Sequence, residues 1–169
     1  MMNILLAVLI LPAAIAYDPW PLPLSYSVGT TALSIDASLS FTIAEDANPL
    51  TSPILAAALK RYAHSIPNGF ACSSEKHAVL DRLHHNDKKA TTAATSGSST
   101  LTVCTVSVTD QEEVLGEGTD ESYSLDVASD GTCTLSSETV PGVLRGLESL
   151  SQLAGEACLI ENAPVQVLQ

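Results

Sequence analysis

An amphipathic segment near the C-terminus, marked by proline and glycine, constrains the fold of this chain most strongly. Its apolar residues recur at three- and four-residue spacing, which places them on one face of a helix. They are Val140, Val143, Leu144, Leu147, Leu150 and Leu153. Thr139 suits the N-cap, Pro141 the first turn and Gly155 the C-terminal end. The pattern therefore predicts a helix over residues 139–153 with one side packed on a core.

Two glycines lie inside this predicted helix, at Gly142 and Gly146. Each costs about 1 kcal/mol relative to alanine in a helix interior. We expect the helix to approach a neighbouring element closely at these positions, because glycine has no side chain to obstruct that approach.

Strand-like patterns occupy much of the remaining chain. Apolar and polar residues alternate over 39–43, and residues 101–108 are β-branched and apolar enough for a central strand. A β-hairpin is predicted over 123–135, because two alternating runs flank an Asp-Gly turn at 130–131. Residues 159–167 fit either a last short strand or the start of a linker.

A second amphipathic helix is predicted from Ser52 and Pro53, a cap and a first-turn proline, to about Ile66. The elements then follow in the order β-α-β-β-β-α. This order predicts an α+β fold, a two-layer sandwich with one mostly antiparallel sheet and both amphipathic helices on one face.

The charge of the chain argues against two classes of partner. It carries 19 acidic and 7 basic residues, for a net charge of −12. Nucleic acid is an unsuitable partner because few cations are present to neutralise phosphates. Anionic lipid is unsuitable for the same reason.

The first sixteen residues have the pattern of a signal peptide. A continuous apolar run ends at Leu11, and Ala14-Ile15-Ala16 has the small-x-small form of a cleavage site. We expect cleavage after Ala16, passage through the secretory pathway, and delivery outside the cell or to a lysosome or vacuole. We expect no membrane association after cleavage.

Four cysteines are present, Cys72, Cys104, Cys133 and Cys158, and they allow three disulfide pairings. Oxidising compartments permit disulfides, but Cys104 and Cys133 also fit small buried residues within strands. The spacing matches no zinc motif. We expect neither a metal nor another cofactor.

Several short segments in the second half of the chain resemble one family when they are taken together. They are residues 120–125 (Asp-Glu-Ser-Tyr-Ser-Leu), 135–140 (Leu-Ser-Ser-Glu-Thr-Val), 142–148 (Gly-Val-Leu-Arg-Gly-Leu-Glu) and 151–153 (Ser-Gln-Leu). With Trp20-Pro-Leu-Pro23 near the start, they resemble the N-terminal domain of the β-N-acetylhexosaminidases, glycoside hydrolases of family 20. The resemblance spans roughly residues 20–166 and is thinnest over 71–100.

The resemblance implies an accessory domain that precedes a (β/α)8 barrel in the same chain. In the family, the barrel carries an Asp-Glu pair within a His-x-Gly-Gly-Asp-Glu motif, and the glycan substrate binds only there. A barrel needs about 250 residues, and three residues follow Gln166. Asp120-Glu121 lacks the preceding His-x-Gly-Gly, so we interpret these carboxylates as solvated charges. We therefore expect no catalytic residue in this chain and no activity from it alone.

The expected layout is a signal peptide at 1–16, an accessory domain at 17–163 with a flexible loop at 87–100, and the start of a linker at 164–169. Two functions stay open: a fragment of a β-N-acetylhexosaminidase, or a freestanding secreted module that binds a partner or glycan. Arg145 and Glu148 are the candidate inter-domain contacts. The alternative is an i,i+3 ion pair of about 0.2–0.5 kcal/mol on a solvated helix face.

Overall fold

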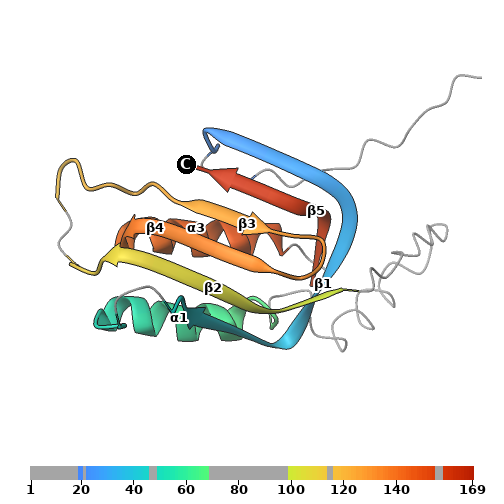
Figure 1. Cartoon of the computed structure of the whole chain (residues 1–169), viewed down its shortest axis with the longest axis horizontal. Helices are drawn as coiled ribbons and strands as arrows, with labels where there is room; N and C mark the ends of the chain where they lie inside the picture. The colour runs from blue at the N-terminus through green and yellow to red at the C-terminus, as the bar shows by residue number, and fades with distance from the viewer. Residues whose placement is uncertain (1–18, 21, 46–48, 69–98, 114–115, 155–157) are drawn as a thin grey trace, which may run out of the picture.

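The computed structural model describes residues 19–20, 22–45, 49–68, 99–113, 116–154 and 158–169. The predicted signal peptide and residues 87–98 of the predicted loop lie outside this part of the chain. Five strands and two helices are placed within it (Figure 1). They are β1 (Ser25–Ile43), α1 (Pro53–Ser65), β2 (Thr100–Asp110), β3 (Ser124–Val127), β4 (Cys133–Thr139), α3 (Val140–Leu153) and β5 (Leu159–Leu168).

The strands are paired in the order β1-β2-β4-β3-β5, and β1 closes the ring by pairing with β5. This closure is possible because β1 is long and bent. Its residues 25–34 run antiparallel to β5, and its residues 34–43 run parallel to β2. The pairing register shifts between Ile35 and Ser40. In Figure 1, β1 runs beside β5 and then turns towards β2.

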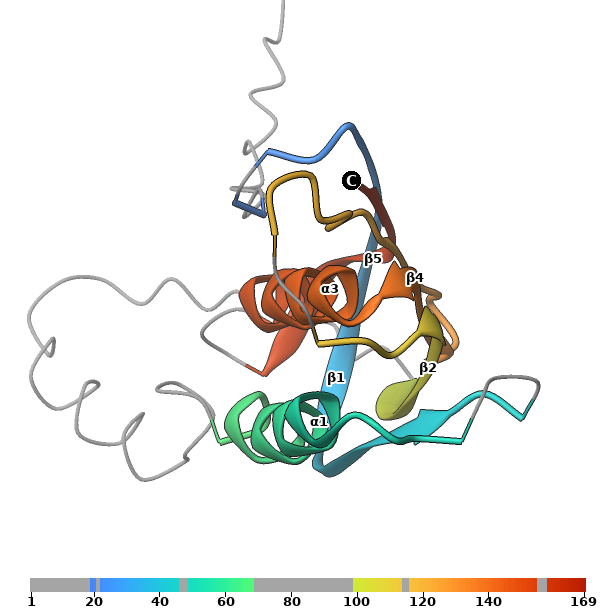
Figure 2. The same ribbon diagram turned by 90° about the vertical axis from the view of Figure 1, so that its left-hand side faces the viewer.

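Both helices cover the same face of the strands, and Figure 2 shows them side by side. The core between the layers is apolar and includes Leu33, Leu55, Leu101, Leu125, Leu135, Leu147, Leu150 and Ile160, all fully buried. The predicted α+β class and the shared helix face are confirmed. The sheet is mixed: three of the pairings are antiparallel, and the β1–β2 and β2–β4 pairings are parallel.

Helix α3 begins as its sequence predicts. Thr139 has extended backbone angles, and its Oγ1 accepts a hydrogen bond from the Gly142 N–H at 3.1 Å. A Cβ at Gly142 would lie 2.3 Å from the Ser122 carbonyl oxygen, and one at Gly146 would lie 2.2 Å from Leu135 Cδ1. The expected close approach is therefore confirmed. Gly155, the expected end of the helix, lies outside the described residues, and Ala154 occupies the C-cap.

Helix α1 is capped partly by a distant segment. Ser52 Oγ accepts from the Leu55 N–H at 3.0 Å, as an N-cap residue should. Glu113 Oε1 accepts from the Ile54 N–H at 2.9 Å, which places a carboxylate at the positive end of the helix. The segment after β2 thus fixes the start of α1.

Two strands extend further than the sequence predicts. The strand expected over 39–43 extends back to Ser25. Residues 164–168 belong to β5 and pair with β3 and β1, so they form part of the sheet rather than of a linker. The predicted hairpin is confirmed as β3 and β4, with Leu125 opposite Leu135.

A disulfide joins Cys104 of β2 to Cys133 of β4. These residues lie opposite each other in the parallel β2–β4 register. Cys158 is also disulfide-bonded. The alternative that Cys104 and Cys133 are only small buried residues is therefore wrong. No helix in the described ranges has the length and apolar character that crossing a bilayer requires.

Candidate docking surface

The outer face of α3 carries both residues that the sequence singled out, Arg145 and Glu148. A depression of about 700 Å³ lies along this face. Its lining residues are Trp20, Tyr62, Glu121, Pro141, Leu144, Arg145, Glu148 and Gln152. Residues from the start of the chain, from α1 and from the segment before β3 therefore meet over α3. We call this depression and its rim the α3 surface.

Arg145 forms a long-range ion pair across the α3 surface. Its Nε donates to Glu121 Oε2 at 2.9 Å, and both side chains are about half exposed, at 50% and 45%. The hydrogen bond and charge of Glu121 raise the pKa of Arg145, with a smaller contribution from Glu148. Arg145 thus pairs with Glu121, in place of the i,i+3 pair with Glu148 that helix spacing allowed. Glu121 is a partner of Arg145, so describing it only as a solvated charge was incomplete.

Glu148 links the two helices. Tyr62 Oη of α1 donates to Glu148 Oε2 at 2.7 Å. Burial, followed by the hydrogen bond to Glu148 and its negative charge, raises the pKa of Tyr62 above its ordinary value. Both candidate contact residues therefore have partners within this domain, one on each side of the α3 surface.

Trp20 is held by its backbone while its side chain faces solvent. Its N–H donates to Gln152 Oε1 at 2.6 Å, and its carbonyl accepts from Gln152 Nε2 at 2.9 Å. The Trp20 residue is nevertheless 77% exposed, and Leu22 and Leu24 are 72% and 86% exposed. A tryptophan usually buries a large apolar area. The start of the described chain therefore displays apolar side chains, and Trp20 does so beside α3.

Asp120 has a structural role in the turn before β3. Its Oδ1 accepts from the Ser122 N–H at 2.8 Å, and its carbonyl accepts from the Thr139 hydroxyl at 2.6 Å. Hydrogen bonds from the backbone and the side chain of Ser122 lower the pKa of the Asp120 carboxyl. Asp120 and Glu121 thus have separate partners. Within the described ranges, no group of His, Cys, Asp and Glu residues is arranged to hold a metal ion.

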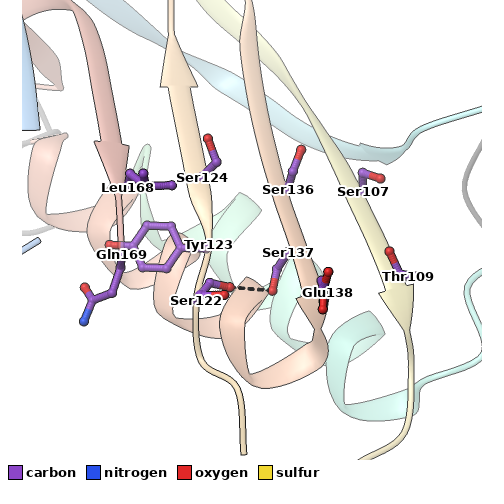
Figure 3. Close-up of a pocket in the computed structure, with 10 residues that line it drawn as sticks. All are labelled: Ser107, Thr109, Ser122, Tyr123, Ser124, Ser136, Ser137, Glu138, Leu168 and Gln169. Carbon is purple, nitrogen blue, oxygen red and sulfur yellow. Dashed lines mark hydrogen bonds between the residues drawn. The ribbon is translucent and has the colours of Figure 1, made fainter. Parts of the chain in front are cut away.

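A second hollow of about 330 Å³ lies at one end of the sheet and is lined mainly by hydroxyl groups (Figure 3). Ser107 stands on β2, Ser124 on β3, and Ser136 and Glu138 on β4. Ser137 Oγ donates to the Ser122 carbonyl at 2.7 Å. A hydroxyl nucleophile needs an adjacent general base to be activated. The lining offers one carboxylate, Glu138, and no imidazole.

Comparison with known proteins decides the family. A family model described as "beta-acetyl hexosaminidase like" matches residues 19–153. The chain belongs to this family. It corresponds to the N-terminal accessory domain of the family 20 glycoside hydrolases, as the sequence motifs predicted, and we refer to it as the hexosaminidase N-terminal domain.

Two relatives show how much of a longer protein this domain represents. It is 33% identical over 140 residues to Beta-hexosaminidase 1 from Arabidopsis thaliana, a match covering 79% of this chain and 24% of the relative. It is 28% identical over 134 residues to Beta-hexosaminidase subunit B1 from Dictyostelium discoideum, covering 79% of this chain and 20% of that relative. The hexosaminidase N-terminal domain thus spans less than a quarter of either relative.

The fold also occurs among solved structures, and a chitobiase is one example. The chitobiase of Flavobacterium johnsoniae superposes with a TM-score of 0.53 and 19% sequence identity, over 90% of this chain and 20% of the chitobiase chain. At 19% identity, this likeness shows that the two chains share a fold.

Sequence reasoning did not place Trp20, Tyr62, Glu121 and Gln152 together. Trp20 stood out only as part of a family motif. Glu121 and Arg145 are 24 positions apart, and Trp20 and Gln152 are 132 apart. No local period reports contacts at such separations. A tryptophan among prolines was the signal that the sequence offered.

Proposed function

We propose that this domain is the non-catalytic N-terminal part of a β-N-acetylhexosaminidase. Such an enzyme removes terminal N-acetylhexosamine from glycoconjugates or chitin-type oligosaccharides. The proposed role of this domain is to pack against a (β/α)8 catalytic domain in the same polypeptide, where the glycan would bind. The family match and the small share of each relative that the domain covers support this proposal.

The construction of the α3 surface carries the proposal. Protein interfaces combine an apolar centre with a polar rim. Trp20 and the half-buried Leu144 supply apolar area, while Arg145 and Glu148 lie on the polar side with partners already in place. A charged side chain with a partner in its own domain is not left unpaired when an interface excludes water. It therefore needs no charged partner from the other domain. We propose Arg145 and Glu148 as inter-domain contacts on this basis.

A secretory route is part of the same proposal. Disulfides form and persist mainly in oxidising compartments. The Cys104–Cys133 disulfide and the bonded Cys158 support the expected signal peptide at 1–16 and cleavage after Ala16. The proposed destination is the cell exterior or a lysosome or vacuole.

A chimera tests the proposed function. Residues 17–169 would replace the matching region of the Arabidopsis thaliana relative, giving a complete polypeptide. We expect this chimera to hydrolyse an aryl N-acetylglucosaminide and to unfold at a higher temperature than the relative without that region. We expect the 169-residue chain alone to give no turnover. A chimera that matches the shortened relative in both measurements would contradict the proposed function, as would turnover by the chain alone.

A paired charge reversal tests Arg145 as a contact residue. The double variant Glu121→Arg/Arg145→Glu keeps an ion pair between these two positions but reverses both of the charges that would face a partner. We expect the isolated domain to lose no more than about 0.5 kcal/mol, from the new like-charge pair with Glu148. The chimera should unfold at a lower temperature than the parent chimera. Glu138→Lys on the hydroxyl-lined side of the sheet is the control and should leave the chimera unchanged. Equal unfolding temperatures for the exchanged and parent chimeras would exclude the contact role.

A further inference from the structure

We infer that Trp20 is the residue that anchors this domain to the catalytic domain, by inserting its indole into an apolar recess of that domain. The inference rests on the proposed function and names the residue responsible for the contact. Residues 19–20 and 22–24, which precede β1, carry this anchor, and we call them the arm. Trp20 and the leucines of the arm are the three most exposed of the large hydrophobic residues in the described structure.

The arm is ordered by contacts that leave its apolar side chains free. Pro19 is buried, and the Gln152 side chain holds both backbone polar groups of Trp20. Pro23 restricts its own backbone and that of the preceding residue. Fixing a binding segment before association reduces the entropy that binding must overcome. An exposed tryptophan on a fixed backbone is therefore arranged for insertion into a partner.

The structure also indicates which partner is within reach. Ser25, the first residue of β1, pairs with Leu168 in the β1–β5 register. The next residue, Gln169, pairs with Tyr123 through two backbone hydrogen bonds of 3.1 and 3.3 Å. Any segment that continues after Gln169 therefore starts beside the base of the arm. A domain attached there has a high effective concentration for the arm, as expected of a catalytic domain in the same polypeptide.

The chemistry of the α3 surface defines what the partner must present. Trp20 and Leu144 are apolar, and the neighbouring Arg145 and Glu148 already have partners. Tryptophan is enriched among the residues that contribute most to binding, and its N–H usually finds an acceptor when buried. The partner surface should therefore have an apolar recess with one hydrogen-bond acceptor at its edge.

The test compares Trp20→Ala in the isolated chain and in the chimera described above. The isolated chain should keep its unfolding midpoint, because Trp20 is largely exposed and Gln152 holds it by the backbone. In the chimera, a protease that cuts between the two domains should act roughly tenfold faster on the variant, as loss of an anchor residue implies. Gln152→Ala should also speed cleavage, by a smaller factor, because the indole remains but its backbone is no longer held.

Val103→Thr is the matched control, because Val103 is another exposed apolar residue, at 40%, on β2. The protease should cleave the Val103→Thr chimera at the same rate as the parent chimera. A parent chimera that is active and stable, together with unchanged cleavage of Trp20→Ala, would overturn the anchor while leaving the proposed function intact. A parent chimera no better than the shortened relative would overturn the proposed function and the anchor with it. A clear fall in the unfolding midpoint of isolated Trp20→Ala would assign Trp20 to the domain's own stability instead.

Discussion

Cys104 and Cys133 occupy opposite positions on two parallel strands, and a disulfide joins them across the centre of the sheet. Parallel strands need a crossover, so their register is not set by a tight turn. Here β3 comes between β2 and β4 in the sequence but lies on the far side of β4 in the sheet. The covalent link fixes the β2–β4 register directly.

Removing this disulfide should lower the free energy of unfolding. The two cysteines are 29 residues apart. Closing a loop of that size in the unfolded chain is worth about 3–4 kcal/mol in the chain-entropy model. We expect the Cys104→Ala/Cys133→Ala variant to lose roughly that amount in urea unfolding. The variant keeps Cys158 intact, so the comparison isolates one link. A loss below about 1 kcal/mol would show that other contacts hold the register.

Gly142→Ala should destabilise the domain despite the higher helix propensity of alanine. The added Cβ would lie 2.3 Å from the Ser122 carbonyl oxygen, a backbone atom that cannot rotate away. Overpacking typically costs about 1–3 kcal/mol, and alanine recovers about 1 kcal/mol of propensity. We expect a net loss of up to about 2 kcal/mol in urea unfolding. Gly116→Ala is the control, since nothing lies within 4 Å of its added Cβ. Equal stability of both variants would mean that α3 can shift.

Thr139→Ala should weaken the start of α3. The hydroxyl accepts from the Gly142 N–H and donates to the Asp120 carbonyl. Loss of an N-cap costs about 0.5–2 kcal/mol, and the second hydrogen bond places this site in the upper part of that range. Thr139→Ser keeps the hydroxyl and should stay near the parent value. The measurement is chemical unfolding followed by far-ultraviolet circular dichroism. A serine variant as weak as the alanine variant would assign the effect to the lost methyl group.

The stability of the domain should depend on Tyr62 at alkaline pH. Burial and Glu148 raise the pKa of Tyr62 in the folded chain above its ordinary value of 10.0. Between the unfolded and folded pKa values, the folded chain keeps a proton that the unfolded chain has lost. The free energy of unfolding therefore falls as pH rises above about 10. Tyr62→Phe should show a shallower fall from pH 9 to 11. Parallel pH profiles for the parent and Tyr62→Phe would contradict the raised pKa.

Features determined by neighbouring residues could be predicted from the sequence, and features determined by distant partners could not. The caps at Ser52 and Thr139 act within three residues, and both helix starts were predicted from them. The outer part of β1 escaped prediction because Gly29, Thr30 and Thr31 interrupt its apolar alternation, and pairing with the distant β5 holds it as a strand. The same dependence explains why residues 164–168 resembled a linker.

The α3 surface shows the same difference between local and distant determinants. Arg145 and Glu148 could be identified because they lie on the polar side of a clear helix. Their partners, Glu121 and Tyr62, come from other segments, and only the folded chain brings them together. Trp20 has no helical or strand period of its own, so its position relative to α3 depends on Gln152.

The closed ring of strands also constrains the order in which the domain can be built on a ribosome. The first strand pairs with the last, and Ser25 lies opposite Leu168. During synthesis, β1 can meet β2 early, but its outer half has no partner until the final strand has left the exit tunnel. Contacts between such distant segments also slow folding, because a long loop must close before they form. The newly made domain therefore spends most of its synthesis with one end of its sheet open.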